Sequence, residues 1–224
     1  STSRRQRQMC IRDRYTEPYK MNLKKISLLV LLLVIADQAL KIWVKTHMHL
    51  DESITVFPDW FQLHFIENKG AAFGMRLSLG DTYDWGKLLL GLFRIAMVGV
   101  IGWFTAHLYR SRPDTPKGVF VGLALILAGA LGNILDSAFY GLLFSESTPY
   151  TVAEFGGHYA GFMMGKVVDM FYFPLFQWEN VPRLLEFLVD RNNYFFGAVF
   201  NLADAYISVA VVYLLVFQFR FFSK

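Results

Sequence analysis

The feature that most constrains this chain is a long apolar run near its C-terminus that contains an aspartate. Between Tyr194 and Phe217 the polar side chains are Asn201, Asp204 and three hydroxyl-bearing residues, Tyr206, Ser208 and Tyr213. The run is long enough to cross a bilayer. An ionisable group is costly to hold in lipid, so Asp204 marks a candidate functional site. Asn201 and Asp204 are three positions apart, which predicts that both lie on one face of a helix.

The composition is typical of an integral membrane protein, with 54% hydrophobic residues and 22 Phe among 224 residues. The net charge of +4 comes from residues 1–20, which carry six Lys or Arg and two acids. We expect residues 1–20 to be a disordered or non-native extension and residues 21–224 to form one domain. Because the single cysteine, Cys10, lies in the extension, the domain offers no thiol nucleophile or disulfide. We expect no nucleic-acid partner.

Hydropathy predicts four transmembrane helices, at about residues 26–44, 88–108, 118–135 and 194–219. Their orientation follows from the basic residues beside them. Segments 22–25, 109–117 and 220–224 hold seven Lys or Arg in eighteen positions, whereas segments 45–87 and 137–193 hold seven in one hundred. The positive-inside rule therefore predicts that both termini are cytoplasmic and both long loops lie outside.

The two outer loops contain further predicted elements. Residues 54–57 and 61–66 have the pattern of strands, with Pro58-Asp59 as the turn between them, which predicts a small antiparallel sheet on the membrane surface. Residues 181–189 form a short amphipathic stretch. The predicted fold class is an all-α membrane protein with four transmembrane helices, a small extracytoplasmic antiparallel sheet and a short amphipathic helix.

With this topology, the buried polar residues gather near the outer leaflet. Asp37 and Lys41 fall late in the first helix, Asp136 ends the third, and Asp204 is expected about ten residues into the fourth. Two facing aspartates disfavour double ionisation, so one can act as a base toward water while the other donates a proton. The candidates for such a pair are Asp37, Asp136, Asp169 and Asp204. Asp37 also has a structural interpretation, because Lys41 lies one helical turn away.

Five motifs, taken in order, resemble those of the lipoprotein signal peptidases (signal peptidase II). They are Asp37-Gln38 with Lys41, Asn68-Lys-Gly70-Ala-Ala72-Phe73-Gly74, Gly132-Asn133-Ile-Leu-Asp136, Val167-Val-Asp169 and Phe200-Asn201-Leu-Ala-Asp204. The resemblance covers roughly residues 21–219. Each motif alone is weak, but together and in this order they are highly specific.

The resemblance implies a four-helix aspartyl endopeptidase of the bacterial inner membrane. Such an enzyme removes signal peptides from prolipoproteins, cutting before a diacylglyceryl-modified cysteine. By motif match, Asp169 and Asp204 are the catalytic pair, and the residues that bind substrate or support the site are Asn68, Gly70, Asn133, Asp136, Asn201, Asp37 and Lys41. The resemblance implies a prolipoprotein substrate in contact with membrane lipid, no cofactor and no metal. We expect a monomer with its active site near the periplasmic leaflet.

This chain departs from the family pattern in two places. Ser137 stands where the family usually has an arginine, directly after the third-helix motif. The gaps from Asp136 to Asp169 and from Asp169 to Asp204 are also longer than usual, so an extra outer segment around residues 146–165 is expected to form a lid or a partner surface.

Other function classes explain the sequence less well. A small proton-coupled transporter would use buried aspartates and the repeated Asn-x-x-Asp, but it would need matching broken helices and acids at the midplane. A membrane scaffold would leave the buried acids unexplained. The pair His47 and His49 could bind a metal, but no acidic or Cys partners follow at ligand spacing.

Overall fold

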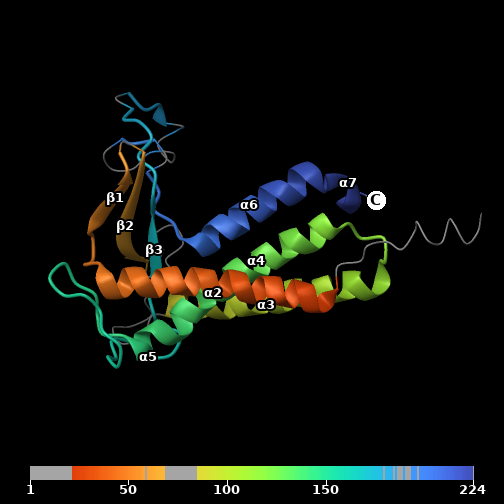
Figure 1. Ribbon diagram of the computed structural model, residues 1–224, viewed down its shortest axis with the longest axis horizontal. Helices are drawn as coiled ribbons and strands as arrows, with labels where there is room; N and C mark the ends of the chain where they lie inside the picture. The colour runs from red at the N-terminus through yellow and green to blue at the C-terminus, as the bar shows by residue number, and fades with distance from the viewer. Residues whose placement is uncertain are drawn as a thin grey trace, which may run out of the picture.

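The computed structural model describes residues 22–58, 60–68, 85–178, 180–183, 185, 189, 193–195 and 197–223. Figure 1 shows a bundle of helices with a small sheet standing across one end. The start of α2 and the end of α7 lie at the opposite end of the bundle. The predicted extension, residues 1–20, lies outside the described residues.

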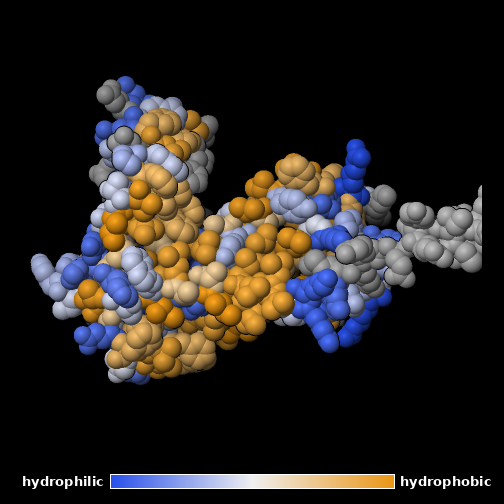
Figure 2. All heavy atoms as spheres, in the orientation of Figure 1, coloured by the Kyte–Doolittle hydropathy of each residue, from blue (hydrophilic) through white to orange (hydrophobic). Residues whose placement is uncertain are grey.

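Three helices are long and apolar enough to cross a membrane: α2 (Leu23–His47), α3 (Trp85–Ser111) and α4 (Lys117–Leu135). They confirm the first three predicted helices, and each observed helix extends beyond or matches the predicted range. Figure 2 shows hydrophobic surface over the middle of the bundle, with hydrophilic residues gathered at the end away from the sheet. A belt of this kind is the surface expected of helices that face lipid.

Helix α4 does not stop at Leu135. It continues through a π-helical turn, η2 (Asp136–Tyr140), into the short helix α5 (Gly141–Leu143). A π turn inserts an extra residue into the helix, and such turns are frequent at functional sites. Asp136 and Ser137 are the first two residues of this turn, and both are buried.

The last apolar run begins its helix later than predicted. Helix α6 spans Leu202–Phe217 and is followed by α7 (Phe219–Phe222). The Asn201 side chain caps α6 by accepting a hydrogen bond from Asp204 N at 2.9 Å, the role for which Asn is favoured. The predicted start near residue 194 and the predicted depth of Asp204 were therefore wrong, because Asp204 lies in the first turn of α6.

Two glycines of α4 allow the helices to approach closely. A Cβ at Gly129 would lie 2.3 Å from the Ala203 carbonyl oxygen of α6, and a Cβ at Gly132 would lie 2.5 Å from an Asp37 carboxylate oxygen of α2. Both contacts are shorter than any side-chain atom tolerates, so α2 and α6 can reach α4 only where α4 has no side chain. Small residues thus permit close helix packing here.

The sheet is antiparallel with the order β1 (Ser53–Phe57), β2 (Phe61–Asn68), β3 (Val167–Tyr172). The first two strands confirm the predicted hairpin, whereas β3 was not predicted. Ile66 pairs with Asp169 across the β2–β3 ladder, and Asn68 pairs with Val167. Of the predicted amphipathic helix at 181–189, only residues 181–183, 185 and 189 are described. There, Leu185 N donates to Pro182 O in a single turn.

Candidate active site

Strand β3 and the start of α6 are joined by backbone hydrogen bonds next to the site. Phe171 N donates to Phe200 O at 2.7 Å, and Phe200 N donates to Phe171 O at 3.1 Å. Asp169 lies two residues before this bridge and Asn201 one residue after it. The Asn201 amide donates to an Asp169 carboxylate oxygen at 2.7 Å. A local pairing of two chain segments thus places an aspartate of the sheet beside the N-terminal cap of α6.

Asn201 also links Asp169 to Asp204. The side-chain oxygen of Asn201 accepts the backbone N–H of Asp204. The side-chain nitrogen of Asn201 donates to Asp169 and, at 3.1 Å, to the side-chain oxygen of Asn133. Asn133 of α4 in turn donates to an Asp204 carboxylate oxygen at 2.8 Å. The two carboxylates of Asp169 and Asp204 therefore share one network of amide side chains, as the motif match predicts.

The buried cation Lys41 contacts this network through Asn133. Lys41 Nζ lies 3.0 Å from an Asp37 oxygen, 2.9 Å from an Asp136 oxygen and 2.9 Å from the Asn133 carbonyl oxygen. Lys41, Asp37 and Asp136 have fully buried side chains. Breaking such a buried charge pair on one side costs about 3–5 kcal/mol. Asp37 further accepts the Ala203 N–H of α6 at 3.0 Å, so it holds the helix that carries Asp204.

Gln38 completes the supporting cluster. Its amide donates to Asp136 at 2.8 Å, and its carbonyl oxygen accepts the Tyr140 hydroxyl at 3.1 Å. The sequence motif contained Gln38 but gave it no role. The contacts of Gln38 with Asp136 and Tyr140 could be assigned only after α2 was placed beside the end of α4.

Asp169 is the carboxylate whose protonation the site perturbs most clearly. Burial and the negative charge of Asp204 raise the pKa of the Asp169 carboxyl to about 7, against a lowering influence of side-chain hydrogen bonds from Asn201 and Asn68. At neutral pH this group is therefore close to half protonated. A carboxyl with such a pKa can donate or accept a proton under physiological conditions.

Ser137 is covered by the extra outer segment. Its hydroxyl donates to Asn133 O at 3.0 Å, and its carbonyl oxygen accepts the Gly165 N–H at 2.8 Å. A Cβ at Gly165 would lie only 2.2 Å from the Asp136 carbonyl oxygen. Because the backbone at Gly165 packs directly on the π turn, the space at residue 137 suits a small side chain. The cation that contacts Asp136 is Lys41.

A second buried ionic cluster ties the outer segment to the sheet. Glu67 of β2 forms ion pairs with Lys45 of α2 and, at 3.0 Å, with Lys166, which also pairs with Glu146 at 3.0 Å. Burial pulls the pKa of the Glu67 carboxyl upward, but the charges of Lys45 and Lys166 outweigh it, so the pKa lies below its ordinary value. This cluster was not predicted.

The remaining predicted site residues differ in how far the structure places them. Asn68 lies at the end of β2 and hydrogen-bonds Asp169, whereas Gly70 lies outside the described residues. Arg94 of α3 is partly buried, and its charge interacts with Asp204, Asp136 and Asp169. Within the described part of the chain, no three His, Cys, Asp or Glu side chains gather in a way that could hold a metal ion.

Apolar helices with a buried carboxylate network at one end define the class of membrane-embedded proteins, and the comparison of folds agrees with this architecture. Two solved structures of a bacterial membrane enzyme match with TM-scores of 0.56 and 0.55 at 19% and 20% identity. The matches cover 90% and 88% of this chain and 91% and 94% of the solved chains. A family model described as Signal peptidase (SPase) II matches residues 29–220. The chain thus belongs to the signal peptidase II family, a family of proteases.

Curated relatives agree with this assignment. A lipoprotein signal peptidase of Porphyromonas gingivalis is 45% identical over 196 residues, covering 86% of this chain and 82% of the relative. A lipoprotein signal peptidase of Amoebophilus asiaticus is 35% identical over 187 residues, covering 82% of this chain and 72% of the relative. Family membership favours a peptidase over the proton-coupled transporter considered from the sequence.

Proposed function

We propose that this protein removes signal peptides from diacylglyceryl-modified prolipoproteins in the bacterial inner membrane, cutting before the lipidated cysteine. The names of the relatives support the prolipoprotein substrate. The observation that carries the chemistry is the amide network between the two carboxylates: Asn201 donates to Asp169 and to Asn133, and Asn133 donates to Asp204.

In the proposed mechanism the two aspartates activate a water between them. The ionised member of the pair takes a proton from the water as it attacks the scissile carbonyl, and the protonated member donates its proton to the carbonyl oxygen. The proton taken from the water then passes to the leaving amine as the carbon–nitrogen bond breaks, and the proton on the former carbonyl oxygen returns to the aspartate that donated it, which restores the pair. Asn133 and Asn201 hold the carboxylates in place during this exchange. Lys41 and Asp37 position the helices and take no part in proton transfer.

We further propose that α6 and α7 together form a fourth transmembrane segment. Residues 202–222 are 21 in number, within the roughly 17–25 residues that a span requires. Both termini are then cytoplasmic, and the sheet lies along the periplasmic surface because its strands run across the end of the bundle (Figure 1). We expect the enzyme to act as a monomer.

An aromatic row supports substrate entry beside the sheet. The ring of Phe57 stacks on Trp60, Phe61 stacks on Phe173, and Phe173 stacks on Phe200, which directly precedes Asn201. Phe57 and Trp60 are about half exposed. In the proposed orientation the row runs at the membrane interface from the outer edge of the sheet to the carboxylates, so it can contact the lipidated end of the substrate.

The test is cleavage of a purified diacylglyceryl prolipoprotein by the detergent-solubilised enzyme. We expect wild type to cut before the lipidated cysteine, Asp169→Asn and Asp204→Asn to lose at least 10³-fold in rate, and the unlipidated substrate to remain uncut. The pH–rate profile of wild type should be bell-shaped, reporting the two macroscopic pKa values of the pair. Near-normal cleavage by either variant would overturn the catalytic assignment.

A further inference from the structure

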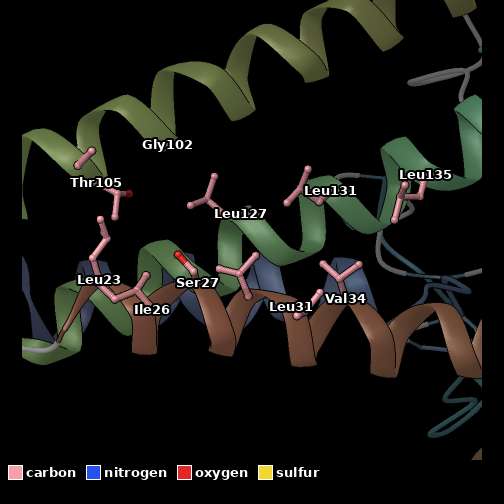
Figure 3. Close-up of a pocket in the computed structure, with 12 residues that line it drawn as sticks. Leu23, Ile26, Ser27, Leu31, Val34, Gly102, Thr105, Leu127, Leu131 and Leu135 are labelled. Atoms are coloured by element: carbon pink, nitrogen blue, oxygen red, sulfur yellow. The ribbon is translucent and has the colours of Figure 1, made fainter.

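A groove separates α2 from α3 and runs along the bundle from Leu23 of α2 to Leu135 of α4. Both helices pack beside α4, which forms the floor of the groove, and the labelled side chains point into the space between them (Figure 3). Its volume is about 420 Å³. The lining is aliphatic except for Ser27 and Thr105, and the Thr105 hydroxyl is already bonded to Ile101 O in its own helix.

The length and apolar lining of the groove fit an extended hydrocarbon chain. On α2 the lining runs from Leu23 to Val34, about 16 Å at the usual helical rise. This is close to the depth of one leaflet, since the hydrocarbon core is about 30 Å thick.

Unpaired cations stand at the end of the groove away from the sheet. Lys24 lies three residues before Ser27, and Arg110 lies four residues after Ala106, so each continues the lining face of its helix. Both side chains are exposed, and neither forms an ion pair with a described residue. Basic pockets between transmembrane helices on the cytoplasmic side are typical binding places for anionic lipid headgroups.

We propose that this groove binds one anionic glycerophospholipid, with an acyl chain between α2 and α3 and the phosphate between Lys24 and Arg110. The bound lipid fills the space beside α4 and so stabilises α3, the helix that carries Arg94 toward the carboxylates. The proposed headgroup site lies at the ends of α2 and α3 far from the carboxylates, and lipid binding there does not depend on the assignment of Asp169 and Asp204.

Two glycines of α3 provide a matched test of the acyl-chain site. A Cβ at Gly102 or at Gly99 meets no atom within 4 Å, but Gly102 lines the groove and Gly99 does not. Wild type, Gly102→Leu and Gly99→Leu are reconstituted in nanodiscs of equal phosphatidylglycerol and phosphatidylcholine, released into mild detergent and weighed by native mass spectrometry. We expect one retained phospholipid in wild type and Gly99→Leu, and at least a fivefold loss in Gly102→Leu.

The headgroup is tested in the same assay. Wild type should retain phosphatidylglycerol at least fivefold over phosphatidylcholine, and Lys24→Gln with Arg110→Gln should retain lipid without that preference. Equal retention by Gly102→Leu and wild type, or equal retention of the two lipids by wild type, would overturn the proposal. So would displacement of the lipid by added prolipoprotein, which would assign the groove to the substrate. Thermal unfolding of each variant shows that it is folded, and the readout requires no cleavage.

Discussion

At the scale of single residues, the ionised carboxylate of Asp169 destabilises the folded state. Its carboxyl has a pKa near 7 because of burial and the charge of Asp204, against an ordinary value of 3.8. When folding raises the pKa of an acid, the protonated form of that acid stabilises the folded state. This contribution is complete below about pH 4 and is lost as the pH rises through 7.

Asp169→Asn should therefore unfold at a higher temperature than wild type at pH 8, because a neutral amide of similar shape replaces a buried charge. The difference should shrink progressively as the pH is lowered to 4. Thermal unfolding of the detergent-solubilised proteins between pH 4 and 8 measures it. The exposed Asp114 provides the control, since Asp114→Asn should show no such trend. A lower midpoint for Asp169→Asn at pH 8 would contradict the expectation.

The residues of the proposed site could be recognised from the sequence more readily than their surroundings. The carboxylates and amides each lie in a local motif, so their types and order were visible without a structure. The cluster of Lys45, Glu67 and Lys166 joins a helix, a strand and a loop, and no local spacing relates them. Contacts of that kind become visible only once the chain is folded.

At the scale of elements, the position of Asp204 depends on how closely α6 approaches α4. Gly129→Ala would place a methyl group 2.3 Å from the Ala203 carbonyl, so the start of α6 must shift. Because Asp204 follows Ala203 directly, we expect cleavage to fall about 10²-fold, as misplacement of about 1 Å can cause. Gly99→Ala, which meets no neighbour within 4 Å, should keep wild-type activity. Unchanged cleavage by Gly129→Ala would show that α6 adjusts without moving Asp204.

Glu67 is expected to hold the outer segment on the sheet. Glu67→Gln would leave Lys45, which is fully buried, and Lys166 without their shared acid. Removing one partner of a buried ion pair costs about 3–5 kcal/mol, so the midpoint of thermal unfolding should fall by several degrees. Glu146 pairs with the same lysine but is 62% exposed, and Glu146→Gln should change the midpoint little. Equal shifts in both variants would count against this role for the buried cluster.

Two features of the fold were misplaced or missed from the sequence, each for its own physical reason. Hydropathy cannot locate the start of α6, because residues 194–200 are as apolar as the helix that follows, and the helix begins where Asn201 caps it. Strand β3 was not predicted, because its partner β2 is about one hundred residues away in the sequence. Strand pairing over such a distance leaves no signal in local pattern.

At the scale of the whole molecule, the proposed topology can be tested with single cysteines. Each cysteine is introduced into a chain that carries Cys10→Ser. Tyr150 of the outer segment is 89% exposed and is replaced in Tyr150→Cys. Asp114 lies in the loop between α3 and α4 and is replaced in Asp114→Cys. A membrane-impermeant maleimide should label Tyr150→Cys in intact spheroplasts and Asp114→Cys only after permeabilisation. The reverse pattern would place the carboxylates at the cytoplasmic face and would overturn the positive-inside interpretation.

The contacts of Asp37 also have a consequence for how the protein is made. Asp37 lies 166 residues before Ala203, whose N–H it binds. Since translation adds about 5–20 residues per second, about 8–33 s pass between the synthesis of Asp37 and that of Ala203. Throughout this interval Lys41, one turn away and 3.0 Å from the carboxylate, accompanies Asp37 and neutralises it. The pair thus lets the first helix enter lipid early in synthesis with a carboxylate that the last helix will later need.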